Sequence, residues 1–153
     1  AAEQTRELEM VLENLVADLR LDTLLEVDLE VIGQRCCWMD SEEVAQITQI
    51  VREALSNVVQ HAEATRVMVS LRYMGDQTCV TVKDNGRGLA LEGLMEGVGQ
   101  GQGITNMQAR ARILGGELRL RGESGHGLEL VLEIPCGDKR MSAMAPEAAE
   151  RWA

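Results

Sequence analysis

The spacing of hydrophobic residues changes several times along this chain, and the order of those changes limits the folds that the chain can adopt. Apolar residues recur every three or four positions over residues 3–19 and again over 41–61, which predicts two helices. Residues 25–32 lie between them and alternate apolar with acidic side chains, as a half-buried strand does. Asp40 or Ser41 is a suitable N-terminal cap for the second helix.

The second half of the chain predicts two hairpins with a helix between them. The expected elements are strands at 67–73 and 79–82 joined through Gly75-Asp76, a helix at 104–114, and strands at 117–121 and 127–134 turning through Ser124-Gly125. Gly115-Gly116 is expected to stop the helix. This order predicts an α+β fold: a two-layer sandwich with helices on one face of a mixed, mostly antiparallel sheet.

Composition excludes some classes of function. The net charge is -10 and there is no run of Lys or Arg, so a direct nucleic-acid binder is not expected. No run of 18 apolar residues occurs, so no membrane span is expected here. The four cysteines at 36, 37, 79 and 136 include no CxxC pair. That favours free thiols in a reducing compartment, with a metal site or disulfides as the alternatives.

Three polar residues share one side of the long predicted helix. Glu53, Asn57 and His61 are spaced four apart, beside an apolar set expected to face the sheet, Ile47, Ile50, Val51, Ala54 and Val58. The neutral oxygen of Asn57 suits a Mg²⁺ that keeps most of its waters. Glu53 is placed to accept a proton, and His61 to approach a phosphate. The alternative is an ordinary solvated helix flank.

An aspartate follows directly on a predicted strand and precedes alternating glycines. Asp84 is suited to accept a hydrogen bond from an exocyclic amine such as that of adenine. Gly86 and Gly88 allow the backbone to turn sharply and approach a ligand closely. The alternative is a plain strand-ending turn, because Asp, Asn and Gly are the usual residues there.

Residues 85–103 hold seven of the chain's 15 glycines and show no hydrophobic period. Gly101 and Gly103 directly precede the predicted helix, where exposed backbone amides can bind phosphate. The stretch before them can close over a nucleotide as a lid. It is neither a Rossmann fingerprint nor a P-loop. A flexible linker is the alternative.

Together, these motifs resemble the ATPase domain shared by histidine kinases, gyrase, Hsp90-type chaperones and MutL, the Bergerat fold, over about residues 41–136. The resemblance implies binding of ATP with Mg²⁺. It implies a catalytic role for Glu53 and metal binding by Asn57. It also implies nucleotide contacts from Asn57, His61, Asp84, Gly86, Gly88, Gly101 and Gly103.

Residues 52–62 and 103–110 resemble more narrowly the nitrate/nitrite-sensor type of histidine kinase. That likeness implies a cytoplasmic ATPase domain in a membrane-anchored homodimer. Its partners would be its own dimerisation and phosphoacceptor domain and a response regulator with helix-turn-helix output. The expected division is a helix at 1–20 that follows the dimerisation region, the ATPase domain at 21–136 and a disordered tail at 137–153.

Two departures from the family pattern stand out. The third glycine box reads Gly125-His126-Gly127-Leu128, so the usual threonine hydroxyl is missing, and no phosphoacceptor histidine box is present. Two alternatives remain open from the sequence. One is an anti-sigma-factor-type serine kinase or binding regulator with the same fold, and the other is an interaction module that binds no nucleotide.

Overall fold

The computed structural model describes residues 2–33, 39–87, 101–122 and 126–135. In chain order, the elements are α1 (Ala2–Asp22), β1 (Glu26–Ile32), α2 (Ser41–Asn57), the π-helix η1 (Val58–Ala62), β2 (Arg66–Met74), β3 (Gln77–Asp84), α4 (Gly101–Ile113), β4 (Glu117–Gly122) and β5 (Leu128–Pro135). Each predicted helix and strand is present.

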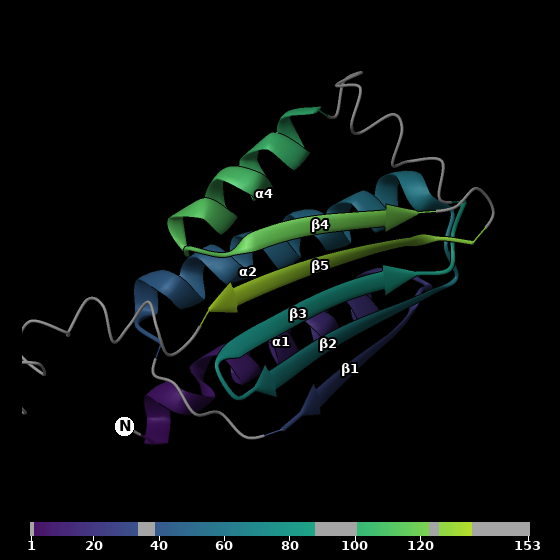
Figure 1. The fold of residues 1–153 in the computed structure, drawn as a ribbon. Coiled ribbons are helices and arrows are strands. Elements are labelled where there is room, and N and C mark those ends of the chain that lie inside the picture. The colour runs from purple at the N-terminus through teal and green to yellow at the C-terminus, as the bar shows by residue number, and fades with distance from the viewer. Residues whose placement is uncertain (1, 34–38, 88–100, 123–125, 136–153) are drawn as a thin grey trace, which may run out of the picture.

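The strands form one five-stranded sheet in the order β1-β2-β3-β5-β4. β1 runs parallel to β2, and the other neighbouring pairs are antiparallel. The helices lie together on one face of this sheet (Figure 1). The expected two-layer sandwich with a mixed, mostly antiparallel sheet is therefore confirmed.

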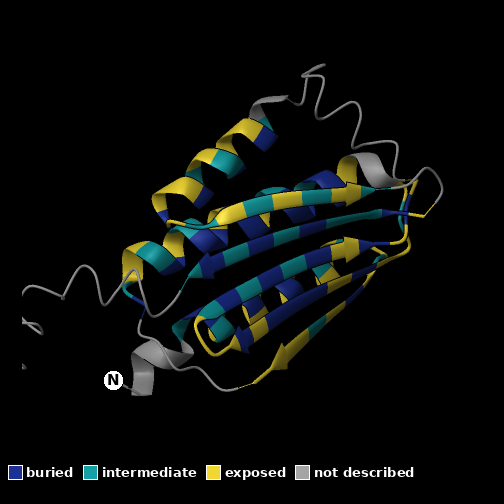
Figure 2. Ribbon diagram, in the orientation of Figure 1, coloured by how far each residue is buried: buried dark blue, intermediate teal, exposed yellow. Residues whose placement is uncertain are grey.

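The core lies between the helices and the covered face of the sheet. Alternate residues of β2 and β3, such as Val69, Leu71 and Val80, are fully buried there. Figure 2 shows the buried positions of α2 turned toward the sheet. The apolar set expected to face the sheet, from Ile47 to Val58, is buried as predicted. Burial of such side chains stabilises the fold by about 1.5–3 kcal/mol each.

The first helix shares this core. Leu8, Leu12 and Val16 of α1 are buried, and the Tyr73 hydroxyl of β2 donates to Glu9 Oε1 at 3.0 Å. α1 packs on β1 and on α2. The helix is thus part of the sandwich layer, while the expected domain boundary near residue 20 stays a prediction.

The long helix begins as predicted but ends differently. Asp40 caps it in a capping box, in which the Asp40 carboxylate accepts from the Glu43 backbone N–H at 2.8 Å. A single helix to His61 was expected. Instead, the α-helix ends at Asn57 and widens into the π-turn η1, which Glu63 closes in a left-handed conformation, φ 53°. π-Turns of this kind are frequent at functional sites.

α4 starts three residues earlier than expected, at Gly101, so Gly101 and Gly103 lie inside its first turn. Its end is as predicted, because Gly115 and Gly116 donate back to Arg112 and Ala111 at 2.9 and 2.8 Å in a Schellman motif. The two predicted hairpins pair antiparallel. The Ser124-Gly125 turn and the 137–153 tail lie outside the described residues. Within the described residues, no helix is long and apolar enough to cross a membrane.

Candidate functional site

Asp84 is the last residue of β3, and its side chain points to the covered face of the sheet. It is 4% exposed, and its Oδ1 accepts from the backbone N–H of Gly86 at 2.7 Å and of Leu128 at 3.4 Å. Burial raises the pKa of this carboxyl, and the two backbone hydrogen bonds oppose that rise. Among the described residues, Oδ2 accepts no hydrogen bond. Asp84 therefore offers one anchored oxygen and one that can accept from a ligand.

The start of β5 packs against Asp84. Gly127 has φ +86°, and a Cβ built there would overlap the Asp84 carbonyl oxygen. Leu128, next in the chain, supplies the N–H that reaches Asp84 Oδ1. The third glycine box thus contacts Asp84 through backbone atoms, although Leu128 carries no hydroxyl.

Asn57 ends α2 with a buried amide. The residue is 7% exposed, and its side chain has no hydrogen-bond partner among the described residues. A buried amide without a partner costs about 1–3 kcal/mol, so an amide retained in such a place fits a ligand. Among the described residues, no three or more His, Cys, Asp or Glu side chains are grouped so that they could hold a metal ion. A cation at Asn57 would therefore take most of its ligands from water and phosphate oxygens, as Mg²⁺ commonly does.

Glu53 lies one turn before Asn57 and is half-buried beside α4. A Cβ on Gly103 would lie 2.6 Å from Glu53 Oε1, so the absence of a side chain at 103 leaves room for this carboxylate. Sequence reasoning assigned Gly103 to phosphate and missed this contact. α4 is also tied to α2 by the Arg110 guanidinium, which donates to Gln46 Oε1 at 2.8 Å.

The fold brings these parts to one end of the sandwich. The C-terminal ends of α2 and β3 and the start of β5 lie at that end, and α4 directs its N-terminal end toward it (Figure 1). His61 lies in η1 at the same end of α2, with its side chain outside the described atoms. Gly86 is buried beside Asp84, and Gly101 opens α4. Gly88 lies outside the described residues.

One residue with several contacts was missed by sequence reasoning. The Asn85 Oδ1 accepts from the backbone N–H groups of Thr65 and Arg66, both at 2.9 Å, and its Nδ2 donates to Thr65 Oγ1 at 2.9 Å. An Asn after a strand-ending Asp looks like an ordinary turn residue. No local signal indicates a partner twenty positions away.

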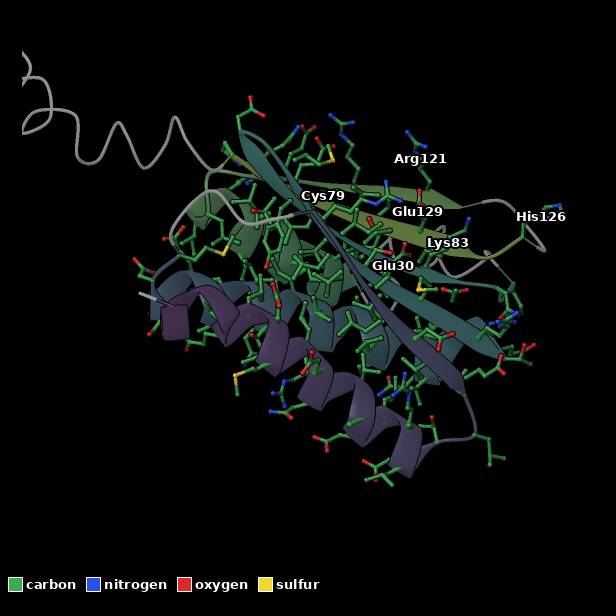
Figure 3. The ribbon with its side chains drawn as sticks, turned by 90° about the horizontal axis from the view of Figure 1, so that it is seen from below. Glu30, Cys79, Lys83, Arg121, His126 and Glu129 are labelled. Carbon is green, nitrogen blue, oxygen red and sulfur yellow. The ribbon has the colours of Figure 1, made fainter. Side chains whose placement is uncertain are left out.

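A shallow hollow of about 180 Å³ lies elsewhere, on the face of the sheet without helices. It is lined by Lys83, Arg121, Gly122, His126, Gly127, Leu128 and Glu129. Lys83, Glu129 and Arg121 stand opposite one another on three neighbouring strands, with the acidic residue in the middle (Figure 3). Positive and negative side chains alternate here. Because the Asp84 carboxylate points to the other face of the sheet, the hollow is separate from it.

Residues 42–138 match the model of the histidine kinase-, DNA gyrase B- and HSP90-like ATPase family. This is more than half of the chain, and the chain belongs to that family. The two relatives described below are sensor histidine kinases, and the chain corresponds to the part of them that carries this ATPase-family domain. The anti-sigma-factor alternative is not favoured by these relatives.

Two relatives show how similar this sequence is to those of sensor histidine kinases. The chain is 31% identical over 109 residues to the signal transduction histidine-protein kinase/phosphatase DegS of Brevibacillus brevis, covering 71% of this chain and 27% of that protein. It is 34% identical over 92 residues to the nitrate/nitrite sensor protein NarX of Escherichia coli K12, covering 60% and 15%. The matched part is therefore a small share of the relatives' length.

Solved structures share the fold. The Acinetobacter baumannii histidine kinase AdeS superposes with a TM-score of 0.67 at 17% identity, covering 85% of this chain and 65% of that one. The ATP-binding domain of PrrB from Mycobacterium tuberculosis superposes with a TM-score of 0.66 at 24% identity, covering 84% and 93%. These neighbours confirm the predicted α+β architecture.

Proposed function

We propose that the chain binds ATP with Mg²⁺ and that, within a longer protein, it transfers the γ-phosphoryl group to a histidine of a dimerisation domain. The observation that carries the proposal is the Asp84 carboxylate. One of its oxygens is held by two backbone N–H groups, and the other has no partner among the described residues. Such a fixed acceptor suits the exocyclic amine of adenine.

The other residues divide the remaining tasks. Gly86 and Gly88 let the backbone approach the adenine closely. The phosphates extend toward Asn57, His61 and the amides at the start of α4, at Gly101 and Gly103. Asn57 would hold Mg²⁺, which when bound neutralises phosphate charge. Positioning and electrostatic stabilisation carry most phosphoryl transfer.

Glu53 serves the acceptor side of the reaction. The incoming imidazole nitrogen bonds to the γ-phosphorus while the bond from that phosphorus to the bridging oxygen breaks, releasing ADP. Glu53 accepts a hydrogen bond from the other imidazole N–H and so polarises the ring toward attack. The glycine at 103 leaves the Glu53 carboxylate room to do so.

The partners and location proposed for the parent protein are inferred from its likeness to the relatives. The phosphoryl group would pass from the histidine to a response regulator with helix-turn-helix output, and the parent protein would be a membrane-anchored homodimer with this domain in the cytoplasm. The likeness to NarX supports nitrate or nitrite as a candidate stimulus. A phosphotransfer assay against purified response regulators tests the relay.

Calorimetry of the chain with ATP, with and without Mg²⁺, tests nucleotide binding. We expect saturable binding that Mg²⁺ strengthens and that Asp84→Asn weakens roughly 30-fold, because the amide NH₂ cannot accept from the adenine amine. Absence of binding at millimolar ATP would contradict the assignment of this site to nucleotide binding. Phosphoryl transfer is tested separately with γ-labelled ATP and a dimerisation-domain fragment supplied in trans.

A further inference from the structure

Asp84 Oδ1 accepts from the N–H of Gly86, two residues on, and this bond closes a small turn whose central residue is Asn85. The orientation of Asn85 therefore sets where the Gly86 N–H lies. That N–H in turn decides how the Asp84 carboxylate is rotated, and so where its second oxygen points.

Asn85 is held by Thr65, which directly precedes β2, and by Arg66, the first residue of β2. Its side chain makes three hydrogen bonds of 2.9 Å to Thr65 and Arg66, and its backbone N–H donates to the Arg66 carbonyl at 3.2 Å. These bonds continue the ladder beyond the last paired residues of the two strands, Val67 and Asp84. The turn at Asp84 is thus anchored to a second, distant piece of chain.

A weaker contact supports the same link. The Arg87 guanidinium lies 3.7 Å from the Glu63 carboxylate, and both side chains are largely exposed, so this ion pair contributes little by itself. The hydrogen bonds of Asn85 therefore contribute more than this ion pair to the connection between residues 63–66 and 85–87.

We infer that Asn85 is a positioning residue for nucleotide selectivity. By bonding to Thr65 and Arg66, it stops the turn after β3 from rotating and keeps the second oxygen of Asp84 directed at the adenine amine. This inference rests on the proposed binding of ATP. It assigns to Asn85 a task that acts through Asp84 and requires no contact with the nucleotide.

The test compares ATP with inosine triphosphate, which carries a carbonyl oxygen where adenine carries the amine. The wild-type chain is expected to bind ATP at least tenfold more tightly, because a carbonyl cannot donate to Asp84. Asn85→Ala should reduce the ratio of the affinity for ATP to the affinity for inosine triphosphate about three- to tenfold. A change that only loosens the fold lowers both affinities equally and leaves the ratio unchanged.

Thr65 provides a matched pair of variants at an exposed position. Thr65→Val keeps the size of the side chain but removes the oxygen that accepts from Asn85 Nδ2, and it should lower the ratio by a smaller factor. Thr65→Ser keeps the oxygen and should retain the wild-type ratio. These two variants decide the question even where Asn85→Ala fails to fold.

The outcomes separate the two claims. A wild-type chain that prefers ATP, with an unchanged ratio in both Asn85→Ala and Thr65→Val, overturns the role of Asn85 and leaves the proposed function standing. A folded wild-type chain that binds neither nucleotide contradicts the proposed function and this inference together. A ratio that falls in both variants and is retained in Thr65→Ser supports the inference.

Discussion

The carbonyl oxygen of Asp84 occupies the space that a side chain on Gly127 would need. Gly127 has φ +86°, which disfavours other residues, and its Cα faces the backbone of β3 without a gap. This contact lets the next residue, Leu128, donate its N–H to the Asp84 carboxylate. The end of β3 and the start of β5 can approach this closely because residue 127 has no Cβ.

Gly127→Ala should destabilise the chain more than Gly75→Ala. Both glycines have positive φ, but a Cβ at Gly75 meets nothing within 4 Å. Alanine at 75 should cost about 1 kcal/mol for its conformation alone, and alanine at 127 at least about 2 kcal/mol more, because backbone atoms must move. Urea unfolding of the two variants measures the difference. Equal costs would show that the contact with Asp84 is unimportant.

Asp84→Asn should raise stability at neutral pH while it weakens ATP binding. Burial raises the pKa of Asp84 above its ordinary 3.8, so the folded chain binds this proton more tightly than the unfolded chain does. Stability therefore falls as the pH rises from that ordinary value through the folded-state pKa. Asparagine keeps the acceptor for Gly86 and carries no charge to bury.

The gain in melting temperature for Asp84→Asn, measured against wild type from pH 3 to 8, should be largest at neutral pH and shrink in acid. Other carboxylates titrate equally in both proteins, so the difference reports on Asp84. A gain that grew as the pH fell would contradict the raised pKa.

Asn57→Leu should leave the fold at least as stable and remove the Mg²⁺-dependent part of ATP affinity. The substitution keeps the approximate volume and replaces a buried amide that has no partner among the described residues. Calorimetry with ATP, with and without Mg²⁺, measures the effect. Asn57→Leu with a wild-type response to Mg²⁺ would exclude Asn57 as the metal ligand.

Gly103→Ala should lower phosphoryl transfer without destabilising the chain. Alanine stabilises a helix by about 0.5–1 kcal/mol relative to glycine, but here its Cβ would lie 2.6 Å from Glu53 Oε1. The flexible Glu53 side chain can move away, which displaces the carboxylate proposed to polarise the acceptor.

Transfer of labelled phosphate to a dimerisation-domain fragment measures this loss. Glu53→Gln serves as the comparison and should show a similar defect with wild-type ATP affinity. Undiminished transfer by Gly103→Ala would mean that the position of the Glu53 carboxylate is not critical.

Much of the architecture was predictable because it depends on local periodicity. The alternating residues of β2 and β3 and the apolar stripe of α2 lie as their spacing indicates, and Asp40 caps α2 as expected. The π-turn after Asn57 was not predicted. The α-helical spacing of Glu53, Asn57 and His61 continues smoothly in the sequence, and no proline or glycine marks the change.

The sequence by itself determined the order of elements and the two hairpins, because these depend on hydrophobic period, and its short motifs indicated the candidate site residues, whose roles stay predictions. Only the tertiary structure decided how those residues are held. The bonds from Asn85 to Thr65 and from Leu128 to Asp84, and the contact of Glu53 with Gly103, join segments 20 to 50 residues apart. Such contacts depend on sheet order and helix packing, and no local pattern encodes them.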